Sequence, residues 1–195
     1  KNYISLLINQ MKSNTETVLN DWSISFRDEF ITSTENSASS AVNKFVNDFI
    51  YYFEKGLRAN KIGIPAGNFS STPLPHTVEG YYIRETSKDL TLEALNAFQN
   101  LFNGTHYNTN DSGVGFKDYL NYLDRNDLVN LINNQLDEAR AKISILDDNY
   151  FDQINNNNTK MTQAYDALQK VVVLIKIDML QAFNISVDYV DADGD

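Results

Sequence analysis

Four residues within one short stretch could do chemistry together: His76, Glu79, Tyr82 and Arg84. His76 and Glu79 have the spacing His-x-x-Glu, so on one helical turn their side chains would share a face and could ligate one metal ion. Iron, copper or zinc would suit such a site. The same pair also fits an ordinary helix start, where Glu79 in the first turn favours the helix dipole. We expect the four residues to lie together at one end of the fold, as a candidate ligand or metal site.

The sequence offers little else for catalysis. It contains no cysteine, which excludes thiolate zinc sites and cysteine nucleophiles. The other histidine, His106, stands in a polar loop, where a solvated side chain is expected. No glycine-rich phosphate loop, Gly-x-Ser-x-Gly or His-Glu-x-x-His motif is present. The residues by themselves therefore predict no catalytic residue.

The acidic tail, residues 186–195, ends in carboxylates at alternate positions: Asp191, Asp193 and Asp195. Alternating oxygen ligands are typical of calcium loops. However, the glycine comes one position too early for an EF-hand, and no glutamate follows at the twelfth position. Calcium binding there stands as an alternative to a frayed terminus.

Composition and charge exclude several classes of protein. The 26 acidic and 16 basic residues give a formal net charge of −10, and the basic residues are scattered, which argues against nucleic acid as a partner. Apolar residues make up 42% and aromatic residues 12% of the chain, enough for a folded core. The longest apolar run, residues 171–175, is far shorter than the about 20 residues of a transmembrane helix.

Apolar residues recur at steps of three or four over most of the chain, which predicts helices. We expect an all-α, up-and-down bundle of four long helices plus a short helix, forming a single domain over residues 1–195. The expected helices are a long one over about 3–31, one ending near Gly56, one over 87–103, a short one around 116–123, one from 126 to about 154, and a last one after a turn at 155–158. Residues 185–190 alternate like a short strand or an extended strap.

A long irregular insert, residues 61–87, is expected between the second and third helices. It contains all three prolines, each of which removes an amide donor and disfavours helix in the residue before it. Its apolar residues indicate that it is ordered and packs on the helix ends, above all through Ile62, Ile64, Phe69 and Leu74.

Several sequence blocks, in order along the chain, resemble the imelysin family. They are VNDFIYY at 46–52, LR at 57–58, KIGIPAG at 61–67, VEGYY at 78–82, LNAFQNLFNG at 95–104 and the acidic DADGD at 191–195. The resemblance implies one of two helical bundles related by a pseudo-twofold axis, in a protein linked to iron uptake. Such proteins are exported to the periplasm or held at the cell surface, often as lipoproteins with a signal peptide in the precursor.

The family marker, Gly-x-His-x-x-Glu, belongs to the amino-terminal half of its members. Here Leu74 stands where that glycine should be, so the His76 and Glu79 pair is not the marker. The chain thus resembles the carboxy-terminal half, and the resemblance transfers no catalytic residue to it. The partner it implies is the missing amino-terminal half of the same protein.

Three functions stay open at this stage. The first is a non-catalytic binding module in the acquisition of iron or another metal or nutrient, with the insert 61–87 as part of the ligand-facing surface. The second is a metallopeptidase of the imelysin type, as the family name suggests. The third is a structural bundle that only docks the missing half.

Overall fold

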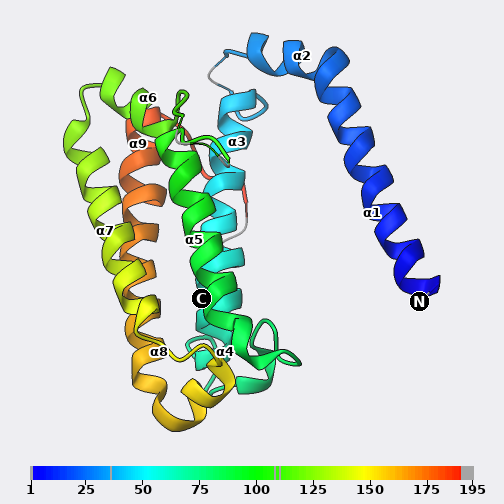
Figure 1. The fold of residues 1–195 in the computed structure, drawn as a ribbon. Helices are drawn as coiled ribbons and strands as arrows, with labels where there is room; N and C mark the ends of the chain where they lie inside the picture. The colour runs from blue at the N-terminus through cyan, green and yellow to red at the C-terminus, as the bar shows by residue number, and fades with distance from the viewer. Residues whose placement is uncertain (1, 36, 108, 110, 190–195) are drawn as a thin grey trace. The chain divides into compact units, whose positions relative to one another are not determined.

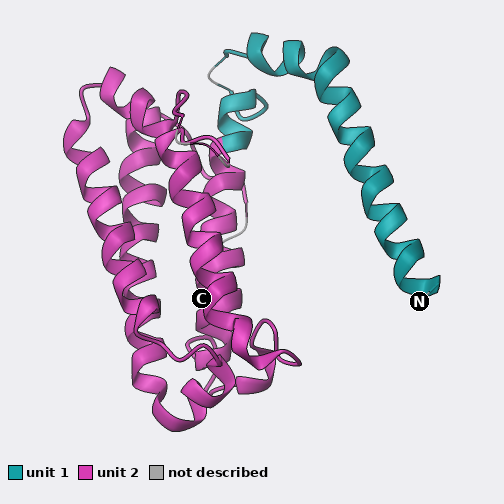
Figure 2. Ribbon diagram, in the orientation of Figure 1, with its two compact units in different colours: residues 1–45 teal, residues 46–195 magenta. Residues whose placement is uncertain are grey.

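The computed structural model describes residues 2–35, 37–107, 109 and 111–189. These residues contain helices and no β-strand beyond an isolated bridge between Thr105 and Ser112, which confirms the expected all-α class. The chain divides into two compact units, Lys1–Phe45 and Val46–Asp195 (Figure 2).

The first unit is dominated by one nearly continuous helical stretch. It consists of α1 (Asn2–Asp21), a π-helical turn η1 (Trp22–Phe26) and α2 (Arg27–Thr32). The apolar residues fall on a helical repeat, as expected, yet none of the residues in these three elements is buried. Aromatic rings cluster toward the end of the stretch, where the ring centroids of Trp22 and Phe30 are 5.5 Å apart and those of Phe30 and Phe45 6.2 Å apart. The apolar periodicity therefore predicts the helical stretch correctly, but no residue of α1, η1 or α2 is buried in a core.

The second unit is the helical bundle. Four helical rods run side by side in its described part (Figure 1). They are α3–η2–α4 (Ala41–Tyr51, Tyr52–Gly63 and Ile64–Ala66), α5 (Ser87–Asn103), α7 (Asn126–Ser144), and α8–η5–α9 (Tyr150–Val173, Leu174–Met179 and Leu180–Phe183); the short helix is α6 (Phe116–Tyr122). The first of these rods begins in the first unit, since α3 crosses the boundary at Val46.

The bundle core is rich in aromatic contacts between rods. Phe49 of α3 stacks on Phe98 of α5 with ring centroids 3.9 Å apart, and Phe53 of η2 lies 4.5 Å from the same ring. Leu168, with no exposed surface, packs into this core from α8. Burying a large apolar side chain contributes about 1.5–3 kcal/mol, so these contacts hold the rods together.

The rod α3–η2–α4 ends later in the sequence than expected. Instead of ending near Gly56, the rod continues through the π-helical η2 and α4 to Ala66, and Gly67 ends it with φ of 88°. The helix passes Gly56 because η2 buries a complete face, and that burial outweighs the roughly 1 kcal/mol that a helical glycine costs. The irregular part of the insert is therefore residues 67–86, interrupted by two 3₁₀ turns, η3 (Pro75–Thr77) and η4 (Arg84–Thr86). Of its expected anchors, Ile62 is fully buried and Ile64, Phe69 and Leu74 are half-buried.

The turn expected at 155–158 is present as a kink inside α8, where two helical segments join. The last two rods are separated earlier, because α7 ends at Ser144 and Asn149 caps α8 by accepting a hydrogen bond from the Asp152 amide at 3.2 Å. Asn157 leaves helical geometry, with φ of −155° and ψ of 80°. The buried Gln153 side chain donates to the Asn157 carbonyl at 2.7 Å, which gives that carbonyl a partner at the break.

Residues 185–189 form an extended strap on the second unit. The Asn47 side chain holds it from both sides, donating to the Ser186 carbonyl at 3.1 Å and accepting from the Asp188 amide at 3.2 Å. Ile185 is buried at the start of the strap. Of the two forms expected here, the strap is the one adopted. The calcium candidates Asp191, Asp193 and Asp195 lie outside the described residues.

Candidate functional site

The four candidate residues all lie on the surface segment, which we define as residues 67–86 of the second unit. His76 sits in η3 and Arg84 in η4, and both are exposed. Tyr82 is 96% exposed, and Glu79 is exposed as well. All four side chains are therefore accessible from solvent.

The backbone of the surface segment is fixed at its base. The Leu74 amide donates to the Pro65 carbonyl at 2.8 Å, and the Asn158 side chain donates to the Ala66 carbonyl at 2.9 Å. Val78 is buried in the bundle core. The segment is thus an ordered surface feature that packs onto the bundle.

Glu79 serves as an anchor of this segment. Its carboxylate forms an ion pair with Lys61 of η2, and its carbonyl accepts a hydrogen bond from the Ser87 hydroxyl at 2.7 Å. Partial burial, together with the negative charge of Glu79, raises the pKa of Tyr52 above its ordinary value. Any ligand that takes the Glu79 carboxylate must compete with Lys61.

Tyr82 and Arg84 meet through Tyr81, in what we call the aromatic–arginine cluster: Tyr81, Tyr82, Arg84 and Phe151. The Arg84 guanidinium lies 4.4 Å from the Phe151 ring centroid and 5.4 Å from that of Tyr81. Tyr81 and Tyr82 meet edge-to-face at 5.2 Å. His76, by contrast, makes no hydrogen bond or ion pair with another described residue. The residues described in the structure also contain no group of three or more histidine or acidic residues placed to hold a metal ion, so metal binding by His76 and Glu79 stays a prediction.

Sequence reasoning missed a second polar site, the buried charged cluster of Glu54, Arg58 and Lys176. Glu54 is completely buried, and its Oε1 lies 2.9 Å from the Lys176 Nζ and 3.7 Å from the Arg58 Nη2. Its Oε2 accepts a hydrogen bond from the Tyr189 hydroxyl at 3.0 Å. A buried carboxylate requires such compensation, because leaving water without partners costs several kcal/mol.

Arg58 is 1% exposed and is enclosed by aromatic and amide groups. Its Nη1 donates to the Tyr165 hydroxyl at 3.1 Å and to the Gln169 amide oxygen. The guanidinium also lies over the rings of Phe69, at 5.6 Å, and Tyr165, at 5.4 Å. The sequence signal for this site was a glutamate and an arginine four residues apart, directly beside the apolar residues Phe53 and Leu57.

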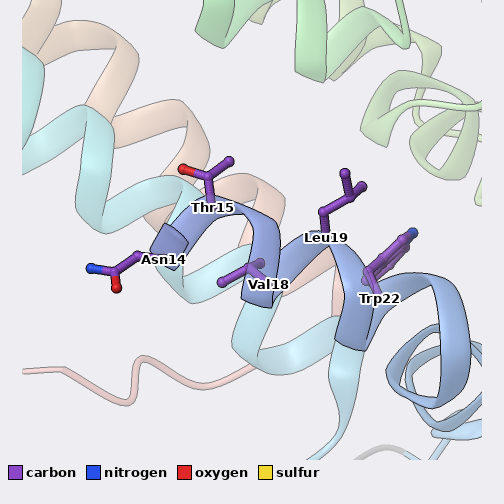
Figure 3. Close-up of a pocket in the computed structure, with 5 residues that line it drawn as sticks. All are labelled: Asn14, Thr15, Val18, Leu19 and Trp22. Atoms are coloured by element: carbon purple, nitrogen blue, oxygen red, sulfur yellow. The ribbon is translucent and has the colours of Figure 1, made fainter. Parts of the chain in front are cut away.

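A shallow hollow on the first unit has no such chemistry. Asn14, Thr15, Val18, Leu19 and Trp22 line it, all on one face of α1 and the start of η1 (Figure 3). These side chains are exposed and none of them is titratable. The hollow is an apolar surface feature and no candidate for catalysis.

The family model named peptidase M75, whose description is imelysin, matches residues 1–176. The match covers most of the chain. The chain belongs to the imelysin family. No curated protein and no solved structure shows a significant match.

The blocks that carry the imelysin resemblance surround both polar sites. The block at 46–52 leads into η2, the block at 61–67 closes that rod, and the block at 78–82 contains Glu79 and Tyr82. Leu74, in the place of the marker glycine, precedes η3. Among the described residues of this imelysin, no helix has both the length and the apolar character needed to cross a bilayer.

Proposed function

We propose that this imelysin-family chain is a non-catalytic binding module of an exported protein that acquires iron or another metal or nutrient. The protein would reside in the periplasm or be anchored at the outer-membrane surface. The surface segment, residues 67–86, would face the ligand. The observation that supports this proposal is an exposed aromatic–arginine cluster on a backbone that is held in place.

Such a surface suits binding for two physical reasons. Tyrosine and arginine are enriched among the residues that dominate binding energy, and here Tyr82 is 96% and Ile83 71% exposed. A segment that is ordered before binding also loses less conformational entropy on association. The Lys61–Glu79 ion pair and the buried Val78 provide that order.

Calorimetric titration of the chain with ferric nitrilotriacetate and with ferrous, copper and zinc ions tests the proposal directly. We expect binding of at least one ion and a loss of affinity of about tenfold or more in His76→Ala and Glu79→Gln, because each removes a ligand. His106→Ala is the matched control, since His106 is also exposed and in a loop. The proposal fails if no ion binds to the chain or to the full-length protein. Equal loss in His106→Ala would contradict the assigned residues.

A second candidate, a metallopeptidase, is favoured by the family description as a peptidase. A hydrolytic zinc site typically needs three protein ligands and a bound water, of which His76 and Glu79 could supply two. Incubation with an unfolded protein substrate, with and without a chelator, tests it. Chelator-sensitive cleavage that disappears in His76→Ala would support this function, and absence of cleavage would count against it.

A third candidate is docking of the amino-terminal half of the same protein, which the exposed apolar face of α1 favours. Trp22, the sole tryptophan, borders the hollow on that face. We therefore expect 5-fluorotryptophan in the chain to shift its fluorine resonance when the separately produced amino-terminal half is added. Val18→Lys should abolish the shift, and an unchanged resonance would rule out docking on this face.

A further inference from the structure

The strap, residues 185–189, covers the buried charged cluster with one side chain. The Tyr189 hydroxyl donates to Glu54 Oε2 at 3.0 Å, and the Lys176 ammonium lies 5.7 Å from the Tyr189 ring centroid. The Tyr51 ring meets Tyr189 edge-on at 5.1 Å. Tyr189 therefore contacts both Glu54 and Lys176 of the cluster.

The strap is attached at a few points. The Ile185 amide donates to the Leu180 carbonyl at 3.0 Å, and the residues at 186, 187 and 188 are exposed. Between Ile185 and Tyr189, the Asn47 side chain attaches the strap with two hydrogen bonds. Segments with few buried contacts and exposed backbone open at much lower free energy than the core.

The contacts that Glu54 makes with the two cations do not involve the strap. Its Oε1 lies 2.9 Å from the Lys176 Nζ and 3.7 Å from the Arg58 Nη2. Arg58 retains Tyr165 and Gln169, both on α8. Because these partners of Glu54 lie outside the strap, opening need not leave the carboxylate buried without compensation, and it need not unfold the bundle.

We infer that the strap is a latch: it opens while the bundle stays folded, and its opening exposes the Glu54–Lys176 pair to solvent. Once Tyr189 leaves, Glu54 Oε2 can accept a hydrogen bond from water or from a hydroxyl or amide donor of a ligand. The latch is separate from the surface segment and does not depend on the proposed function.

Lysine acylation of the full chain, followed by peptide mass spectrometry, tests the latch. In the wild type the Lys176 side chain is 13% exposed and that of Lys170 on α8 is 62% exposed, so Lys170 serves as the internal reference. We expect Tyr189→Ala to raise the acylation rate of Lys176 relative to Lys170 by about tenfold or more, since opening no longer has to break the Tyr189 contacts. Tyr189→Phe, which keeps the ring, should give a smaller increase.

Tyr122→Ala is the matched control, because Tyr122 is 82% exposed on α6, and it should leave the ratio unchanged. Hydrogen exchange of the wild type adds a measurement without substitution: the Asp188 amide should exchange much faster than amides in α8. The latch is refuted if the Lys176 ratio does not rise in Tyr189→Ala. It is also refuted if the rise occurs only together with loss of helical circular dichroism, or if Asp188 exchanges as slowly as α8.

Discussion

At the residue scale, Glu54 is the most constrained charge described in the bundle. It has no exposed surface, and its two oxygens contact Lys176, Arg58 and Tyr189. Two of these partners are cations that are themselves largely withdrawn from water. Removing the negative charge therefore removes the carboxylate that both cations contact.

Glu54→Gln is expected to destabilise the chain by about 3–5 kcal/mol, the typical cost of breaking a buried ion pair from one side. Urea denaturation followed by circular dichroism measures this loss. Glu138→Gln is the matched control, because its side chain is 49% exposed and its ion pair with Lys170 is worth only about 0–1 kcal/mol. Similar decreases in the free energy of unfolding of both variants would show that burial does not determine how much Glu54 contributes to stability.

Because of Tyr150, the stability of the folded chain is expected to depend on pH in the alkaline range. Burial raises the pKa of its hydroxyl above the ordinary 10.0, and the nearby Thr91 hydroxyl, which opposes the shift, donates its own proton to the Ser87 carbonyl. The folded state thus holds the Tyr150 proton more tightly than the unfolded state. Its contribution to stability is complete below pH 10.0 and is lost as the pH rises further.

Tyr150→Phe should therefore lose less stability above pH 10.0 than the wild type does. Near neutral pH the substitution should change stability by less than about 1 kcal/mol, because the buried hydroxyl has no hydrogen-bond partner among the described residues. Urea midpoints measured from neutral pH to pH 11 check both expectations, with Tyr122→Phe as the exposed control. Parallel pH profiles for Tyr150→Phe and the wild type would contradict this account.

At the element scale, the π-helical η2 depends on two glycines in different ways. A Cβ on Gly63 would lie 2.5 Å from the Phe69 ring and 2.8 Å from that of Tyr165, the two rings that enclose Arg58. A Cβ on Gly56 would meet only Tyr52, at 3.0 Å, and Tyr52 is 46% exposed and free to shift. The absence of a side chain is therefore required for packing at Gly63, at the end of η2, and not at Gly56.

Gly63→Ala is expected to destabilise the chain by about 1–3 kcal/mol, the usual cost of overpacking a filled core. Gly56→Ala is the control within the same helix and should be neutral or stabilising by up to about 1 kcal/mol, since alanine favours helix over glycine. Thermal unfolding of both variants measures the difference. Equal melting temperatures would mean that the rings of Phe69 and Tyr165 can move aside.

At the scale of the whole molecule, the two units differ in how they are stabilised. The bundle of the second unit has a continuous core, whereas α1, η1 and α2 bury no residue. An isolated helix gains little from propensity alone and draws most of its stability from packing. The first unit should therefore be the less protected part of the chain.

Amides of α1 are expected to exchange with solvent orders of magnitude faster than those of α8, in line with local opening of unpacked helices. Hydrogen exchange of the intact chain, read by mass spectrometry, measures both in one sample. Slow exchange in α1 would show that its apolar face is covered in solution.

The amino-acid sequence is sufficient to predict the helical class, the family and the place of the insert. The spacing of apolar residues sufficed for the helices, because that periodicity is a local property of the chain. The three prolines located the irregular segment, although η2 carried the helix to Ala66 through burial that no local pattern showed. Blocks such as 61–67 and 78–82 carried the family resemblance, which the family match confirmed.

Which residues come into contact depends on how the helices pack together. Glu54 and Lys176 are 122 positions apart, and their contact depends on how η2 packs beside η5. In the sequence, the apolar stripe of α1 resembles that of α8, yet α8 is buried in the bundle and α1 is not. Whether a helix is buried depends on the surfaces of the helices that pack against it. The periodicity of one helix carries no information about those surfaces. For the same reason, the charged residues of η2 appeared as an ordinary helix pair until the fold enclosed them.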